Sequence, residues 1–232
     1  MQARTDEMIH HERECFARYS GLEPHQIELF DVVKNAPTKD LFHKYDGFFM
    51  GGSGEFSIGS NEYPWLEAVK AWLLELLEAD KPLFGSCFGH QILGLALGSK
   101  VEKIEELKEV GTYRMKLSGA SALEPLCSNL PETFDIQLGH QDFVMETPED
   151  CILLGSTENC LNQFFRVKNR LVYTSQFHPE LDYSDMVVRI NFYGDKGYVD
   201  DGSDVEAIRQ SFKRTPESQK ILRNFMGLVK ER

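Results

Sequence analysis

The segment that most constrains the fold of this chain is residues 82–98, PLFGSCFGHQILGLALG. A short apolar run ends at Phe84, and a helical stretch begins almost immediately after it. Cys87 stands at the turn between them, with Gly85 two residues before it and Gly89 two residues after it. The pattern G-x-C-x-G between a strand and a helix is typical of a nucleophile elbow. The segment therefore predicts a buried strand, a sharp turn that carries a reactive side chain, and a helix.

The chemistry of such a turn favours Cys87 as a nucleophile. Side chains in place of the two glycines would clash with the neighbouring strand and helix, and the cysteine itself adopts a strained backbone conformation. At a helix amino terminus the dipole and the free N–H groups favour thiolate over thiol. The N–H of Phe88 is placed to donate to an oxyanion at an attacked carbonyl. A buried, apolar role is expected for the other cysteines, which are Cys15, Cys127, Cys151 and Cys160.

A cysteine nucleophile needs a base, and His178 is the best candidate among the seven histidines. It follows an apolar strand in VYTSQFHPEL, at the carboxyl end of the strand, where an α/β sheet places its ligands. Glu180 can hold the imidazole in one tautomer and support its protonated form. His140 is either a pocket residue or a solvated loop residue, and His90 is a packing or surface residue. Surface positions are expected for the remaining histidines, His10, His11, His25 and His43.

A glycine pair, Gly51-Gly52, ends the apolar run YDGFFM. Such a pair usually marks only a turn. Next to a nucleophile elbow, it predicts a loop whose backbone N–H completes an oxyanion hole. It is not a phosphate-binding loop, because no G-x-x-x-x-G-K-[ST] pattern follows it.

Strand and helix patterns alternate over the first 98 residues, which predicts an α/β fold with a parallel sheet. Helices are expected over residues 6–19 and after Pro64, and strands over 25–33, 45–50 and 81–86. The middle third predicts a small antiparallel extension of the sheet. Its short strands are expected at 111–117, 133–138, 142–146, 152–156, 162–167 and 171–176.

We expect one domain over residues 1–232, with a core over about 22–181 and a C-terminal cover over 182–232. The cover begins with an acidic, aromatic stretch over 182–204, which is either a substrate lid or ordinary surface. Helical patterns follow over 205–213 and 217–229.

The composition excludes several classes of protein. The net charge of −12, without a basic stripe, argues against a nucleic-acid partner. No apolar run approaches the ~20 residues that span a bilayer, and the amino terminus lacks the apolar stretch of a secretory signal. The five cysteines form no C-x-x-C pair, so neither a disulfide framework nor a zinc ribbon is predicted. A cytoplasmic location without a membrane partner, a metal or another cofactor is expected.

The segments GGSGEFS, GSCFGHQILGLALG and QFHPEL occur in this order and resemble the motifs of the class I (triad) glutamine amidotransferases, in particular the stand-alone GMP-synthase-like group. The resemblance spans about residues 22–181 and implies a flavodoxin-like fold, an open and mostly parallel sheet flanked by helices. It implies that Cys87 is the nucleophile, His178 the base and Glu180 its orienter. It further implies that Gly52 and Phe88 form the oxyanion hole, and that Gln91 and His140 contact the substrate.

Three departures from the family pattern stand out. The family opens with an apolar strand, whereas Met1 is followed here by the first helix, so we expect the first strand to be missing. Gln141 replaces the usual glycine in the HQDFV segment that contains His140. No ATP-handling motif is present, so the ammonia acceptor is expected to be a partner synthetase subunit or water.

The resemblance implies an acyl transfer in which the Cys87 thiolate attacks the side-chain amide of glutamine. A γ-glutamyl thioester forms, ammonia leaves, and water then releases glutamate. A γ-glutamyl peptidase that cleaves glutathione-like peptides is the second reading, because the same triad would attack the same acyl group. The third reading is a non-catalytic regulatory protein that retains the fold.

Overall fold

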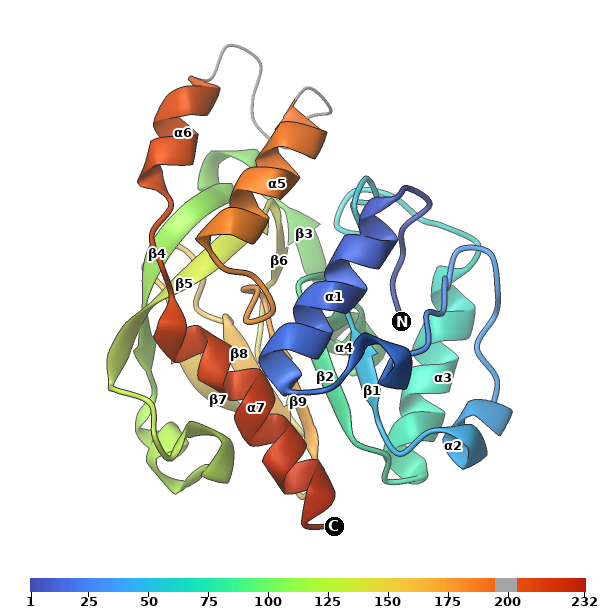
Figure 1. Ribbon diagram of the computed structural model, residues 1–232. Helices are drawn as coiled ribbons and strands as arrows, with labels where there is room; N and C mark the ends of the chain where they lie inside the picture. Colours follow the sequence, from blue (N-terminus) through green and yellow to red (C-terminus); the bar gives the residue numbers. More distant parts are fainter. Residues whose placement is uncertain (195–203) are drawn as a thin grey trace.

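A computed structural model describes residues 1–194 and 204–232 (Figure 1). The main sheet contains strands β1 (Phe48–Met50), β2 (Leu83–Ser86), β4 (Glu109–Leu117), β5 (Thr133–His140), β7 (Cys151–Ser156), β8 (Phe164–Val167) and β9 (Val172–Ser175). Their order across the sheet is β1-β2-β9-β8-β7-β4-β5. A separate antiparallel pair joins β3 (Val101–Lys103) to β6 (Asp142–Val144).

The predicted α/β class is confirmed, and the sheet has two parts. Strands β1, β2 and β9 run parallel to one another. From β9 onward, β8, β7, β4 and β5 each pair antiparallel with their neighbours. The antiparallel part is thus a continuation of the same sheet, as the middle third of the sequence predicts.

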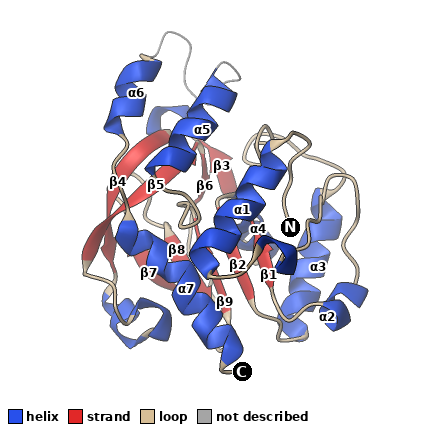
Figure 2. Ribbon diagram, viewed as in Figure 1, coloured by secondary structure: helices blue, strands red, loops and turns tan. Residues whose placement is uncertain are grey.

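Helices cover both faces of the parallel part (Figure 2). Helices α1 (Met8–Ser20) and α7 (Pro216–Lys230) pack on one face, and α3 (Leu66–Glu78) and α4 (Phe88–Ala96) on the other. The remaining helices are α2 (Asp40–Lys44), α5 (Tyr183–Tyr193) and α6 (Val205–Ser211), and short 3-10 turns lie at Pro24–Gln26, Glu105–Leu107, Gly119–Leu123 and Pro125–Cys127.

The register of β2 on β9 explains why both strands begin with two buried apolar or aromatic residues. Leu83 lies opposite Val172, and both belong to the core under α3 and α4. The next pair, Phe84 and Tyr173, belongs to the core under α1 and α7. Because successive side chains point to opposite faces, a strand covered on both faces buries consecutive residues, and small or hydroxyl side chains follow where the strands approach the loops at their carboxyl ends.

The amino-terminal residues lie beside β1. The Met1 ammonium donates to the Phe49 carbonyl at 2.6 Å, and the Gly51 N–H donates to the Met1 carbonyl at 2.9 Å. On its other side Gln2 forms a single parallel bridge with Asp31. Among the described residues, β1 is the first strand of the sheet in chain order.

The strand expected over residues 25–33 is wrong. Pro24–Gln26 forms a 3-10 turn, and the rest of the segment contributes only the bridge at Asp31. An extended segment needs a neighbouring strand to complete its backbone hydrogen bonds, and the backbone beside this one is limited to the stretch around Gln2.

The acidic, aromatic stretch over 182–204 contains α5, and its last residue, Asp204, caps α6. Asp182 caps α5, and its carboxylate accepts the Asp185 N–H at 3.0 Å. Tyr198, Asp200 and Asp201 lie outside the described residues.

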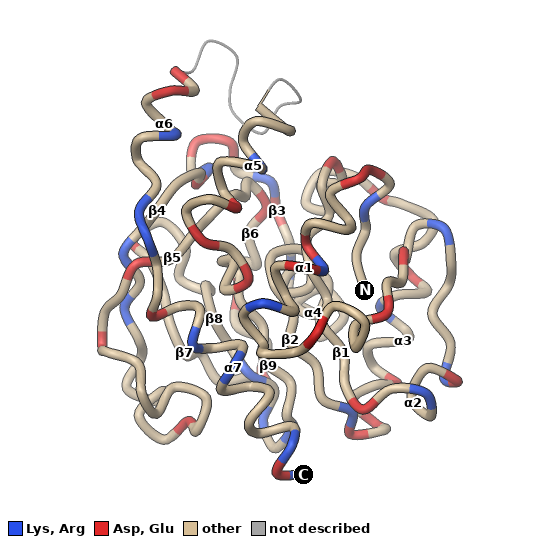
Figure 3. Tube along the Cα trace, viewed as in Figure 1, with Lys and Arg blue, Asp and Glu red and all other residues tan. Residues whose placement is uncertain are grey.

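Charged residues are dispersed along the chain. Figure 3 shows acidic and basic positions interspersed on most elements. In the part of the chain that the structure describes, every helix is too short or too polar to cross a membrane.

Candidate active site

Three loops meet at the carboxyl ends of the parallel strands. They follow β1 at Gly51, β2 at Cys87 and β9 beyond Ser175. The Cys87 N–H donates to the Ser175 carbonyl at 2.8 Å, and the Gly89 N–H donates to the Gly51 carbonyl at 3.2 Å. This edge of a parallel sheet is where α/β proteins place their ligands.

The turn at Cys87 has the strained backbone that an elbow requires. Its φ is 52° and its ψ is −103°, a conformation that residues with a side chain rarely adopt. The helix α4 begins at the next residue, so Cys87 stands at the amino terminus of that helix.

The two flanking glycines are required by close backbone approaches. A Cβ on Gly89 would lie 2.3 Å from the carbonyl oxygen of Met50, and a Cβ on Gly85 would lie 2.8 Å from the carbonyl carbon of Gly89. Both distances are far below van der Waals contact, and both partners are backbone atoms that cannot rotate away. The steric reason inferred from the sequence is therefore present in the structure.

His178 and Glu180 form a buried pair. His178 Nδ1 and Glu180 Oε1 are 2.6 Å apart, and the two side chains are 2% and 0% exposed. The backbone N–H of His178 donates to the Gln137 carbonyl of β5 at 3.0 Å, which fixes the loop to the antiparallel part of the sheet. The contact through Nδ1 leaves Nε2 as the ring nitrogen that can exchange a proton with a nucleophile.

Cys87 and His178 line one cavity of about 330 Å³. Within the described residues, no direct hydrogen bond joins the Cys87 sulfur to the His178 ring. Catalytic hydrogen bonds in ligand-free proteins are often long and tighten when a substrate binds. The cavity is thus lined by a thiol and by an imidazole that Glu180 orients.

Burial decides the protonation states of this pair. It raises the pKa of the Cys87 thiol to about 12, although Arg189 and Arg4 oppose the rise. It lowers the pKa of His178, although Glu180 opposes the fall. Desolvation of the sulfur therefore outweighs the nearby positive charges that favour the thiolate. At neutral pH a thiol faces a neutral imidazole, which is the form of histidine that accepts a proton.

A buried network of charges surrounds the pair. Glu12 of α1 contacts Arg189 of α5, with 2.7 Å between its Oε1 and the nearer guanidinium nitrogen. Arg4 contacts the same carboxylate at 3.4 Å through its Nε. Burial disfavours the ionised form of Glu12, but Arg4, Arg189 and the Gly52 N–H together hold its pKa far below the usual range. Glu12 is thus a carboxylate in the protein interior.

The two donors expected for an oxyanion differ in their surroundings. The Phe88 N–H lies in the first turn of α4, where helices leave N–H groups without an intrahelical acceptor. The Gly52 N–H donates to Glu12 Oε1 at 3.0 Å. In this conformation Gly52 could donate to an oxyanion only by exchanging its bond to Glu12.

The expected substrate contacts, Gln91 and His140, both line the cavity. Gln91 Nε2 donates to the Asp142 carbonyl at 3.1 Å and to Gln176 Oε1 at 3.2 Å, so its carbonyl oxygen is the atom with which it can meet a ligand. His140 lies 3.0 Å from Glu109 through Nε2 and 3.1 Å from the Asp142 carbonyl through Nδ1. Both ring nitrogens therefore contact acceptors within the protein.

The sequence prediction missed Glu12, Arg189 and Arg4. The carboxyl-terminal segment was expected to be a cover, yet α5 brings Arg189 against His178. The sequence does contain a sign that Glu12 is buried. Glu12 lies four residues after Met8 and four before Phe16, on the apolar face of α1. Arg189 likewise shares the buried face of α5 with Met186 and Ile190. A charge at a core position of an amphipathic helix indicates a buried partner.

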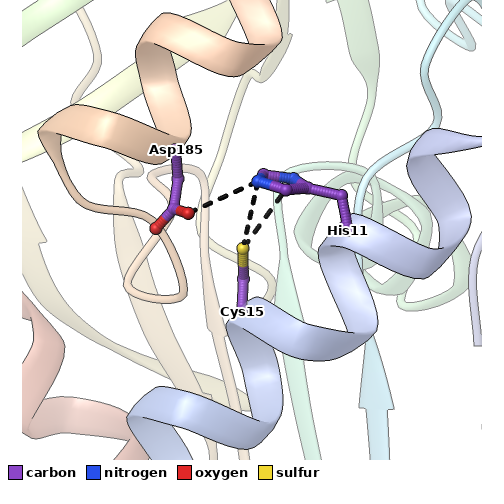
Figure 4. A group of neighbouring side chains, drawn as sticks. All are labelled: His11, Cys15 and Asp185. Atoms are coloured by element: carbon purple, nitrogen blue, oxygen red, sulfur yellow. Dashed lines mark hydrogen bonds and ion pairs between the residues drawn. The ribbon is translucent and has the colours of Figure 1, made fainter.

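A second polar cluster joins the same two helices (Figure 4). His11 Nε2 lies 3.3 Å from Asp185 Oδ1, and the Cys15 sulfur lies 3.7 Å from the same ring nitrogen. Such a group could hold a metal ion, but Arg18 donates to both oxygens of Asp185 at 3.1 Å. Because a cation there would be repelled by Arg18, we interpret the cluster as a polar contact between α1 and α5.

Four histidines were expected at the surface. His11 is half-buried, whereas the other three are exposed: His10, His25 and His43.

His90 was expected to be either a packing residue or a surface residue, and the structure shows that it is a packing residue. It is fully buried, its ring lies tilted against the ring of Phe165 with 4.6 Å between the centroids, and its Nδ1 lies 3.0 Å from Thr174 Oγ1.

The comparisons with known proteins agree on the family to which this chain is similar. The family model described as glutamine amidotransferase class-I matches residues 16–192. A glutamine-hydrolyzing GMP synthase of Caldicellulosiruptor saccharolyticus is 31% identical over 223 residues, which cover 94% of this chain but 40% of that protein. The chain therefore spans less than half the length of that relative.

Two further similarities concern other proteins of this kind. Gamma-glutamyl peptidase 3 of Arabidopsis thaliana is 30% identical over 171 residues, which cover 71% of this chain and 67% of the peptidase. The crystal structure of a glutamine amidotransferase from Thermotoga maritima superposes with a TM-score of 0.77 at 20% identity, over 100% of this chain and 97% of that one. At that identity the superposition shows a shared fold.

Proposed function

Because the chain belongs to the class I glutamine amidotransferase family, we propose that it hydrolyses the side-chain amide of glutamine in the cavity lined by Cys87 and His178. The observation that carries the proposal is the buried His178–Glu180 contact of 2.6 Å in the loop that faces the cysteine elbow. A neutral imidazole held by a carboxylate is suited to deprotonate a thiol.

In the first half of the reaction, His178 takes the proton of the Cys87 thiol as the sulfur attacks the amide carbon. The negative charge that develops on the amide oxygen is stabilised by N–H donors, for which Phe88 is the best-placed candidate. His178 then returns the proton to the amide nitrogen. The C–N bond breaks, ammonia leaves, and a γ-glutamyl thioester remains on Cys87.

In the second half, His178 takes a proton from water, and the hydroxide attacks the thioester carbon. The C–S bond breaks, glutamate leaves, and the proton returns to the sulfur. Glu180 holds the imidazole in one orientation through both halves and stabilises its transient positive charge. Gln91 would accept a hydrogen bond from the substrate ammonium through its carbonyl oxygen, and His140 would form part of the wall around the substrate.

The test uses a diazoketone analogue of glutamine, which alkylates a cysteine that binds it in attacking position. Mass spectrometry should find the label on Cys87, and excess glutamine or His178→Ala should prevent it. Cys87→Ala should abolish ammonia release from glutamine. Cys151→Ala is the matched control, because Cys151 is also buried but lies in β7 away from the cavity, and it should leave turnover unchanged. Unaltered turnover in Cys87→Ala would end the assignment.

A γ-glutamyl peptidase is the second candidate, and the similarity to the Arabidopsis peptidase favours it. The cavity of about 330 Å³ lies within the ~300–1,000 Å³ range of sites that enclose a whole small molecule. The reaction product distinguishes the two candidate functions. Glutamine should release ammonia, whereas a γ-glutamyl peptide should release an amine or a shorter peptide, and the larger kcat/KM identifies the natural class.

The acceptor of the ammonia is either a partner synthetase subunit or water. Similarity to a GMP synthase supports the first. A synthetase partner should raise the glutaminase kcat/KM when its own substrates are added, whereas a free hydrolase should be insensitive to them. A non-catalytic regulatory protein would give no label on Cys87 in a folded sample.

A further inference from the structure

We propose that Arg189 is a positioning residue of this site, which with Glu12 couples the base His178 to the loop that carries Gly52. The inference deepens the proposed function and rests on it for the identity of the reaction. It concerns residues outside the three motifs, contributed by the first helix and by the helix after the His178 loop.

The guanidinium of Arg189 lies between two functional groups. One of its terminal nitrogens is 3.5 Å from His178 Nδ1, the ring nitrogen that also contacts Glu180. The other is 2.7 Å from Glu12 Oε1 and 3.9 Å from Glu180 Oε1. The side chain is 2% exposed, so little solvent screens these interactions.

Glu12 continues the connection to the loop after β1. Its Oε1 accepts both the Gly52 N–H at 3.0 Å and a hydrogen bond from Arg189. Arg4 donates to both of its oxygens at 3.4 Å. One carboxylate oxygen thus joins the proposed oxyanion loop to the arginine that contacts the base. A rotation of the Gly52 peptide toward the sulfur would break this bond and leave Glu12 Oε1 with Arg189 and Arg4 as its donors.

The position of Arg189 is set by the packing of α5 on α1. Asp185, one turn earlier, receives two hydrogen bonds from Arg18 and one from the Asp182 N–H. These hydrogen bonds fix the first turn of α5. Arg189 lies on the next turn and points into the protein interior. Arg189 is therefore held from both ends, by its helix and by Glu12.

The electrostatic consequence follows from the sign of the charge. The charged groups that face the His178 ring are Glu180 from its own loop, Arg189 from α5 and Glu12 from α1. A cation at this position disfavours the imidazolium and favours the thiolate of Cys87. Arg189 lowers the pKa of both groups, against burial at the thiol and together with burial at the imidazole. It therefore makes the thiol more acidic and keeps the base neutral.

The test measures the rate of Cys87 alkylation by iodoacetamide against pH, read at that residue by mass spectrometry. Three variants are compared with wild type. Arg189→Met removes the charge at similar length, Arg189→Lys keeps the charge without the planar fork, and Arg18→Met is the matched control. Arg18 pairs with α5 across the same helix interface but contacts Asp185 rather than His178.

In Arg189→Met the alkylation curve should move to higher pH by about one unit or more, seen as a rate about tenfold or more below that of wild type at each pH between 7 and 9, because a neighbouring opposite charge typically shifts a pKa by ~1–3 units. The acid limb of kcat/KM should also move to higher pH, and kcat/KM should fall at least about tenfold. Arg189→Lys should lose activity with a smaller shift of the curve. Arg18→Met should leave the curve in place.

An unmoved curve in folded Arg189→Met, or an equal shift in Arg18→Met, would overturn the positioning role. If Arg189→Met does not fold, Arg189→Gln provides the neutral variant, and its curve is read in the same way against Arg189→Lys. The alkylation readout needs no substrate. If wild type fails to hydrolyse glutamine while the curve still shifts in Arg189→Met, the proposed substrate is wrong and the positioning role stands.

Discussion

The elbow around Cys87 and the interface between α1 and α5 serve the same cavity, but they are built differently. At the elbow, the residues that matter all lie within 82–98, although Gly89 makes room for the backbone of Met50 in a neighbouring strand. At the interface, Glu12 and Arg189 are 177 positions apart and meet because two helices pack together. The elbow depends on excluded volume, whereas the interface depends on the compensation of buried charge.

This difference predicts different responses to substitution. A steric site tolerates no added atom but is indifferent to charge. A buried charge network tolerates an isosteric change but fails when one member is deleted, because the remaining charges stay desolvated. Both regions can be tested on that basis by changes in the free energy of unfolding.

The largest effect is expected for Glu12→Ala. Deletion of the carboxylate leaves Arg4 and Arg189 facing each other in the interior, and breaking a buried ion pair in this way costs about 3–5 kcal/mol. Glu12→Gln retains acceptor oxygen and shape, so its cost should be clearly smaller. Urea unfolding followed by circular dichroism measures both. Equal losses in the two variants would show that the charge of Glu12 is unimportant.

The next largest effect is expected for Gly89→Ala. The new Cβ would lie 2.3 Å from the Met50 carbonyl oxygen, so β1 and α4 must separate. Overpacking of this kind typically costs about 1–3 kcal/mol, and because the same atoms position Cys87, the alkylation rate at that residue should fall as well. A variant with wild-type stability and reactivity would contradict the steric account of the elbow.

Asp185→Asn should show how much the α1–α5 interface contributes to the pH dependence of the free energy of unfolding. Burial disfavours ionisation of Asp185, but its contacts with His11, the Asp182 N–H and Arg18 hold its pKa well below the usual range. A lowered folded-state pKa stabilises the fold above the unfolded value and loses this contribution as the pH falls through the folded value. The variant should be less stable than wild type by about 1–2 kcal/mol at pH 7.

The difference between wild type and Asp185→Asn should shrink below about pH 4, where the unfolded aspartate becomes protonated. Urea unfolding at several pH values between 3 and 7 checks the trend. A difference that stays constant with pH would mean that the carboxylate charge contributes nothing.

The smallest effect, with the opposite sign, is expected for Gly227→Ala. Gly227 lies in α7, and a Cβ there would meet no atom within 4 Å. Alanine should therefore stabilise the protein by about 0.5–1 kcal/mol through helix propensity. The same substitution is thus expected to destabilise the protein at Gly89 and to stabilise it at Gly227. A loss of stability at both positions would show that the cost at Gly89 is not specific to its steric clash.

The elements with strong periodicity could be predicted from the sequence. The helix that ends at Gly21, the helix after Pro64 and the strands of the antiparallel part all occur near their expected positions. The strand expected over 25–33 does not form, because strand formation depends on what lies beside the segment as well as on its own residues. Local propensity indicates that a segment can be extended, whereas the neighbouring backbone determines whether it joins a sheet.

The sequence by itself determined the strand–turn–helix unit at Cys87 and the short separation of His178 from Glu180. Both can be seen in the sequence because the residues involved stand within a few positions of one another. Only the tertiary structure decided that Glu12 meets Arg189, that the Gly52 N–H faces a carboxylate, and that burial keeps Cys87 a thiol. These depend on desolvation and on charges from distant segments, whose effects are set by packing and have no fixed spacing along the chain.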